Sequence, residues 1–226
     1  MFVRVDEHPT LKLRWATPCI LALMVGVAVW EFLLTVPARA KFMQEWGVVP
    51  AELSLQWQGS GIASAKLFSA LFVHVDSAHL FGNLLFLMLF GFAVERVFRS
   101  RLVLLLFLLC GAIANIASAF LLTNKTGPIV GASGAVSGLI GAYLFLFPRA
   151  SLGIVLPLGL YFQFVRVPAS TLIGLWFLLQ VLYTVTGTSI SAVAWLAHVI
   201  GFIAGFVLAQ VLKPLLYSNA RSKILH

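Results

Sequence analysis

Two residues in separate apolar segments, a serine and a histidine, have side chains that can catalyse acyl transfer. Ser133 lies near the start of the run 131–141, where small and hydroxyl-bearing residues precede an apolar stretch, and His198 lies much later in the chain. A serine hydroxyl is a weak nucleophile until a neighbouring base accepts its proton, and histidine is the usual base. This pair therefore predicts Ser133 as the nucleophile and His198 as its general base.

Two further polar residues interrupt an earlier apolar segment. His79 and Asn83 are four positions apart, so they share one face of a helix. In the topology given below, they lie within about 10 Å of the same membrane surface as Ser133 and His198. Because an unpartnered polar group is costly in hydrocarbon, we expect the four side chains to face one another around a small hydrated cavity.

Glycine spacing indicates how two of these segments approach each other. Gly134 and Gly138 form one small-xxx-small pair, and Gly201 and Gly205 form another on the helix face that carries His198. Such pairs allow close contact between helix backbones, which a serine–imidazole hydrogen bond requires. Each pattern alone is common in packed membrane helices, and a lone serine often bonds its own helix. Their combination favours a catalytic site.

The composition excludes a soluble globular domain. The chain has 226 residues, of which 61% are hydrophobic and 10% are charged, against about 45–50% and about 25% in soluble domains. The net charge of +8 does not indicate a nucleic-acid partner, because the basic residues lie between apolar runs. Cys19 and Cys110 lie within apolar segments, so neither a disulfide framework nor a metal site is predicted. The sequence predicts a polytopic membrane protein.

The apolar runs predict an all-α domain with six spans between two cytoplasmic tails. A span needs about 20 apolar residues to cross a hydrocarbon core of roughly 30 Å. The first apolar run ends at 36–40 in small residues that resemble a signal-peptide cleavage site. The run is longer than the apolar core of a signal peptide, which favours a retained span. The segment 151–167, which holds Pro157 and Gly159, is too short to span and is expected to be interfacial or re-entrant. The predicted spans are 17–36, 79–94, 102–122, 131–147, 169–185 and 190–212, with tails 1–16 and 213–226 and an outer interfacial loop 37–78.

The basic residues support this topology. With the amino terminus inside, 11 Lys and Arg residues lie on the cytoplasmic side and 4 lie outside, in agreement with the positive-inside rule. The cytoplasmic set is Arg4, Lys12, Arg14, Arg96, Arg99, Arg101, Arg149, Arg166, Lys213, Arg221 and Lys223, and the outer set is Arg39, Lys41, Lys66 and Lys125. Both termini are therefore expected in the cytoplasm. Glu31, inside the first span, is interpreted as a carboxylate that extends toward the outer interface.

The order of these motifs resembles the rhomboid family of intramembrane serine proteases. The resemblance covers residues 67–212 and includes Glu95-Arg96, Pro168-Ala169, Trp176 and Gln180. Its motifs are His74-x4-His79-x3-Asn83, Gly131-x-Ser133-Gly134 and Ala197-His198-x2-Gly201-x3-Gly205, on the second, fourth and sixth spans.

The resemblance implies a six-helix rhomboid fold and a serine–histidine dyad without an acidic third member, a metal or a cofactor. Ser133 would attack the scissile carbonyl, and His198 would transfer its proton to the leaving amine. His79, Asn83 and the Ser133 backbone amide would stabilise the oxyanion. His74 would support the site, as would the four motif glycines, Gly131, Gly134, Gly201 and Gly205.

The expected partners are single-span membrane proteins and the surrounding lipid. A transmembrane helix hides its carbonyl groups in its own hydrogen bonds, so cleavage needs a locally unwound segment. Substrates are expected to have small residues at the scissile bond, near the outer leaflet of a bacterial-type plasma (inner) membrane. No nucleic-acid partner is expected.

Two positions depart from the family pattern. Ala65-Lys66 stands where many members have Trp-Arg in the first outer loop, so that loop must be anchored differently. Ser137 stands where some members place a tyrosine whose ring stacks on the catalytic imidazole. The histidine must therefore be oriented by another group.

Three other classes remain as alternatives, and a fourth, a soluble α/β hydrolase, is excluded. A metal enzyme using His74, His79 and His198 lacks a His-Glu-x-x-His pattern and nearby carboxylates. A transporter would show an inverted pair of broken helices, and the sequence indicates no such pair. A soluble α/β hydrolase would need a glycine two positions after Ser133, where this chain has Ala135, and a strand before Ser133, which the sequence does not predict. A non-proteolytic rhomboid-like chaperone or adaptor is disfavoured because both Ser133 and His198 are present.

Overall fold

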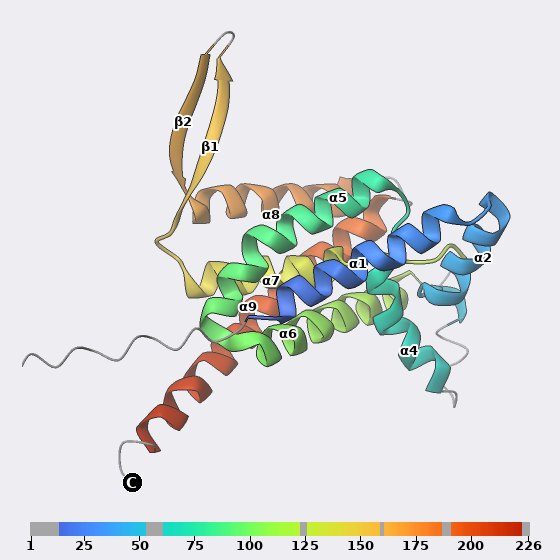
Figure 1. The fold of residues 1–226 in the computed structure, drawn as a ribbon, viewed down its shortest axis with the longest axis horizontal. Coiled ribbons are helices and arrows are strands. Elements are labelled where there is room, and N and C mark those ends of the chain that lie inside the picture. Colours follow the sequence, from blue (N-terminus) through green and yellow to red (C-terminus); the bar gives the residue numbers. More distant parts are fainter. Residues whose placement is uncertain (1–13, 53–60, 123–125, 159–160, 187–190, 223–226) are drawn as a thin grey trace, which may run out of the picture.

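The computed structural model describes residues 14–52, 61–122, 126–158, 161–186 and 191–222. Most of the predicted N-terminal tail, Lys125 and the C-terminal residues 223–226 lie outside these ranges. Figure 1 shows a bundle of helices with a projecting hairpin.

Within the described ranges, four helical stretches are long and apolar enough to cross a membrane. They are α1 (Ala16–Leu33), the continuous stretch Ser77–Leu121, α8 (Ala169–Thr186) and Trp195–Pro214 within α9 (Ser191–Ser222). The helix α7 (Ser133–Leu146) is also apolar but shorter. The predicted helical membrane bundle is confirmed.

The stretch Ser77–Leu121 changes direction near its middle. It consists of α5 (Ser77–Phe86), a π-helical segment (Leu87–Gly91) and α6 (Phe92–Leu121). Arg99 has φ 63° and ψ 162°, which are not helical angles, so the helix breaks there. In Figure 1 the rest of α6 runs back across the bundle. The break falls in the basic segment that the sequence places between two spans.

A buried carboxylate fixes the start of α1. Glu95 of α6 is 1% exposed, and its two carboxylate oxygens accept hydrogen bonds from the backbone N–H groups of Ala16 and Thr17, at 2.9 and 3.0 Å. The first amides of a helix have no partner within the helix and carry partial positive charge. Glu95 therefore acts as an N-terminal cap supplied by another helix.

The central helix of the bundle is α7. Ten consecutive residues, from Gly134 to Tyr143, are buried, because α7 packs against α6, α9 and the π-helical segment. Its 14 residues extend only about 21 Å, which is less than the hydrocarbon thickness. The non-helical residues before it are held by backbone hydrogen bonds between Ile129 and Val48, and from Gly131 N–H to the Ala70 carbonyl at 2.8 Å. The helix therefore begins inside the bundle.

The described part of the loop 37–78 is largely helical. It contains α2 (Val36–Trp46), α4 (Gly61–Ser69) and a 3-10 turn (Ala70–Phe72). Lys66 Nζ donates to the Gln44 carbonyl at 3.2 Å and lies 3.4 Å from a Glu52 carboxylate oxygen. Lys66 thus anchors the loop at one of the two positions that depart from the family pattern.

The segment after α7 forms an antiparallel hairpin. Strands β1 (Ser151–Leu158) and β2 (Tyr161–Pro168) pair from Ser151 with Pro168 to Leu158 with Tyr161. Figure 1 shows the hairpin projecting from the helices. The sequence predicts an interfacial or re-entrant segment here, without strands. Pro157 disfavours a helix, and the valine, isoleucine and phenylalanine residues of this segment suit an extended backbone.

Candidate active site

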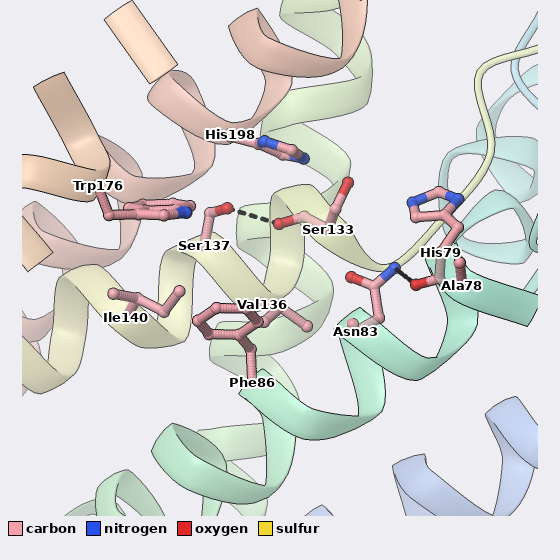
Figure 2. A pocket seen from close by; sticks show the side chains of 11 residues that line it. Ala78, His79, Asn83, Phe86, Ser133, Val136, Ser137, Ile140, Trp176 and His198 are labelled. Carbon is pink, nitrogen blue, oxygen red and sulfur yellow. Dashed lines mark hydrogen bonds between the residues drawn. The ribbon is translucent and has the colours of Figure 1, made fainter. Parts of the chain in front are cut away.

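Four helices surround one cavity of about 190 Å³. Figure 2 shows Ser133 of α7 between His198 of α9 on one side and His79 and Asn83 of α5 on the other. The cavity is lined by Ala78, His79, Gly82, Asn83, Phe86, Ser133, Val136, Ser137, Ile140, Trp176 and His198. The fold thus brings the four polar residues of the predicted site to one place, although up to 119 positions separate them in the sequence (from 79 to 198).

Ser133 is the first residue of α7. Its backbone amide therefore belongs to the helix end where N–H groups lack helical partners and the dipole is positive. One turn later, Ser137 Oγ donates to the Ser133 carbonyl oxygen at 2.7 Å, the dashed line between these residues in Figure 2. Both serines line the cavity, but the Ser137 hydroxyl is engaged with its own helix.

His198 is held from two sides. Its Nδ1 atom lies 2.7 Å from Oε1 of Gln180 on α8. The Trp176 ring stacks on the imidazole with centroids 6.4 Å apart and planes at 26°, and the Trp195 ring meets it edge-on at 5.7 Å. These contacts orient the imidazole in place of the tyrosine that some rhomboid sequences have where this chain has Ser137.

The helices α7 and α9 touch through their glycines. A Cβ atom added to Gly201 would overlap the Gly134 carbonyl oxygen, and one added to Gly205 would overlap that of Gly138. Ala197, which precedes His198, faces Gly134 across the same contact. Any larger residue would push apart the two helices that carry Ser133 and His198. The predicted close approach is present.

Gly131 allows the His79 ring to lie against the chain just before Ser133. Its φ is +117°, a conformation that L side chains rarely adopt. A Cβ atom at this position would lie 2.5 Å from His79 Cε1 and 2.9 Å from His79 Nε2. Glycine is therefore needed both for the backbone conformation and for the space that His79 occupies.

Asn83 and His79 are fixed mainly through backbone groups. Asn83 Nδ2 donates to the His79 carbonyl oxygen at 3.0 Å, as Figure 2 shows, and the His79 N–H donates to the Asp76 carboxylate at 2.7 Å. Asp76 caps α5. A carboxamide has two N–H donors. Among the residues that the structure describes, one donates to the His79 carbonyl, so the other can donate to a ligand in the cavity.

His74 lies behind His79 and does not line the cavity. The two rings meet edge-on with centroids 5.3 Å apart, and His74 Nδ1 lies 3.2 Å from the Phe72 carbonyl oxygen. His74 is 0% exposed. Burial, with a smaller contribution from the neighbouring His79, lowers the pKa of His74 to about 4. A neutral His74 therefore supports His79 at neutral pH.

A buried ion pair holds the backbone that leads to these histidines. Glu31 of α1 is 0% exposed, and its Oε1 lies 3.2 Å from Arg39 Nε. Its Oε2 accepts from the His74 N–H at 3.1 Å, while Arg39 Nη2 donates to the carbonyl groups of His74 and Val75 at 3.1 and 2.6 Å. The position of Glu31 in the first apolar run predicts a carboxylate that extends to the interface. The structure instead buries it, because Arg39 and the His74 amide supply its partners.

The three histidines considered for metal binding do not form a ligand cluster. Among the residues that the structure describes, no group of three or more His, Cys, Asp or Glu side chains is arranged to hold a metal ion.

Comparison with known proteins identifies the fold family. Residues 63–214 match the model of the rhomboid domain. The chain is 31% identical to the rhomboid relative YdcA of Bacillus subtilis over 154 residues, which are 65% of this chain and 70% of that protein. It is 38% identical over 81 residues to the rhomboid protease GluP of the same organism, and 35% identical over 79 residues to RHOMBOID-like protein 1 of Arabidopsis thaliana. These two matches cover 36% and 35% of this chain, but only 15% and 20% of the relatives' length.

Proposed function

This chain belongs to the rhomboid family of intramembrane serine proteases, and on that premise we propose that it is an endopeptidase acting through Ser133 and His198. The observation that carries the proposal is the shared cavity. Ser133 and His198 both line it, on two helices in glycine-mediated backbone contact. The proposal needs no acidic third residue. Oε1 of Gln180 lies 2.7 Å from Nδ1 of His198, which is the imidazole nitrogen that the carboxylate contacts in a catalytic triad.

The proposed reaction has two steps. The Ser133 oxygen bonds to the scissile carbonyl carbon while His198 accepts the hydroxyl proton, and His198 then donates that proton to the leaving amine as the C–N bond breaks. Water then enters the cavity and bonds to the acyl carbon while His198 accepts its proton. His198 returns that proton to the Ser133 oxygen as the acyl C–O bond breaks, which releases the acid product and restores the serine. The cavity's polar side chains support the presence of that water.

Three groups are suited to stabilise the oxyanion. The Ser133 backbone amide lies at the positive end of α7. The Asn83 carboxamide, with its second N–H, and the His79 ring border the same cavity. Donors fixed before the reaction stabilise developing negative charge without reorganisation, and one such donor typically contributes 10²–10³-fold to kcat.

The remaining cavity wall supports small apolar side chains at the scissile bond. Phe86, Val136, Ile140 and Trp176 leave only about 190 Å³. The substrate is proposed to be a single-span membrane protein, locally unwound, and cut near the outer leaflet of a bacterial-type inner membrane. Both termini of the chain would lie in the cytoplasm, as the distribution of basic residues predicts.

Cleavage in lipid vesicles tests the proposal. The purified protein is reconstituted with a panel of single-span substrates, and wild type is compared with Ser133→Ala and His198→Ala. Wild type should release fragments cut near the outer leaflet, and both variants should be inactive. Undiminished cleavage by either variant would exclude the dyad. Substrate capture without cleavage by wild type would favour a chaperone or adaptor.

A further inference from the structure

Gln180 is an unusual residue for its helix. Most described side chains of α8 face outward, for example Leu178 at 62% and Leu182 at 50% exposure. The buried positions given for α8 are Ala169, Ile173 and Gln180, and Gln180 is 4% exposed. A carboxamide inside a membrane bundle needs a hydrogen-bond partner. Its partner here is the imidazole of His198, with 2.7 Å between Oε1 and Nδ1.

This hydrogen bond determines which imidazole nitrogen can act as the base. An amide oxygen only accepts, so Nδ1 must carry the proton in the Gln180–His198 bond. A neutral imidazole has one donor and one acceptor nitrogen. Nε2 is therefore the nitrogen that keeps a free lone pair, which the Ser133 hydroxyl needs.

The same helix also fixes the plane of the ring. Trp176 precedes Gln180 by one turn and stacks on His198 with an interplanar angle of 26°. One face of α8 thus supplies both the stacking surface and the hydrogen-bond acceptor.

We propose that Gln180 is a positioning residue for His198, an inference that rests on the function proposed above. It would hold the imidazole in the Nδ1–H tautomer and keep its orientation when the imidazolium forms, as the acidic member of a catalytic triad does. Unlike a carboxylate, the amide carries no charge, so it orients the base without strongly stabilising its protonated form. Gln180 does not line the cavity and would not contact substrate.

The first test removes the acceptor. Gln180→Leu should lower kcat about 10- to 100-fold, the equivalent of one hydrogen bond to a charged group, and leave KM unchanged. Thr184→Val is the matched control. Thr184 lies one turn further along α8, and its hydroxyl donates to the Gln180 backbone carbonyl at 2.7 Å. This control should keep full activity. A Gln180→Leu variant with wild-type kcat would overturn the inference.

The second test changes charge while keeping shape, and also guards against misfolding of the leucine variant. A carboxylate stabilises an adjacent imidazolium, so Gln180→Glu should move the acid limb of the kcat/KM profile about one to three pH units upward. If the side chain at position 180 did not contact the imidazole, the profile would keep its shape. Superimposable wild-type and Gln180→Glu profiles would contradict the positioning role.

Labelling separates this inference from the function on which it rests. A fluorophosphonate should modify Ser133 in wild type, more slowly in Gln180→Leu, and not in His198→Ala. If wild type is not modified, both proposals fail. If wild type is modified in a His198-dependent manner and Gln180→Leu reacts at the same rate, only the role of Gln180 is excluded.

Discussion

Replacement of Gly201 by alanine should separate the two catalytic helices. The added Cβ would overlap the Gly134 carbonyl oxygen, and restoring an ordinary contact of about 3.4 Å requires a shift of about 1.4 Å. Because Gly134 follows Ser133 and His198 lies one turn before Gly201, that shift would lengthen the distance between nucleophile and base. A 1 Å misplacement can lower the rate about 10²-fold. We expect kcat to fall by that order, with a loss of about 1–3 kcal/mol in the free energy of unfolding from overpacking.

Cleavage of a single-span substrate in vesicles measures this effect, with thermal unfolding recorded on the same preparations. Gly26→Ala is the control, because a Cβ on Gly26 of α1 has no atom within 4 Å. Its activity should equal that of wild type. If Gly201→Ala were as active as Gly26→Ala and equally stable, close contact between α7 and α9 would not be what sets the geometry of the dyad.

Three further predictions concern the surroundings of the dyad. Asn83→Ala should lower kcat about 10²-fold with little change in KM, because an oxyanion donor acts mainly in the transition state; an unchanged kcat would exclude that role. Glu31→Gln should lower the free energy of unfolding by about 1–3 kcal/mol, because Arg39 loses a buried carboxylate partner; Glu45→Gln, in an exposed pair, should cost no more than about 1 kcal/mol, and equal thermal shifts would contradict this. The lowered pKa of His74, about 4, means that the unfolded chain binds a proton first as pH falls from about 6.5. Stability in detergent should therefore decline by up to about 3 kcal/mol between pH 6.5 and 4, and a His74→Gln variant with the same decline would refute this assignment.

Local periodicity was enough to predict which residues share a helix face. His79 and Asn83 are one turn apart, and His198 shares its face with Gly201 and Gly205, as the backbone of a helix requires. The apolar lengths likewise predicted the helical membrane bundle. The grouping of Ser133 with these residues followed from the cost of unpartnered polar groups in hydrocarbon.

Contacts between distant parts of the chain could not be predicted in this way. The Glu31–Arg39 pair depends on how α2 folds back beside α1, and the His198–Gln180 bond depends on the rotation of α8. The positive φ of Gly131 follows from its tertiary setting beside His79. The hairpin after α7 was missed because a short apolar run fits a strand and a buried helix equally well.

Identification of the residue modified by a fluorophosphonate tests the central claim most directly. Wild-type protein in lipid is labelled, digested and analysed by mass spectrometry, alongside His198→Ala. The account predicts a single modified serine, Ser133, and no modification in the variant. Labelling of another serine, such as Ser118 or Ser137, or equal labelling without His198, would contradict it.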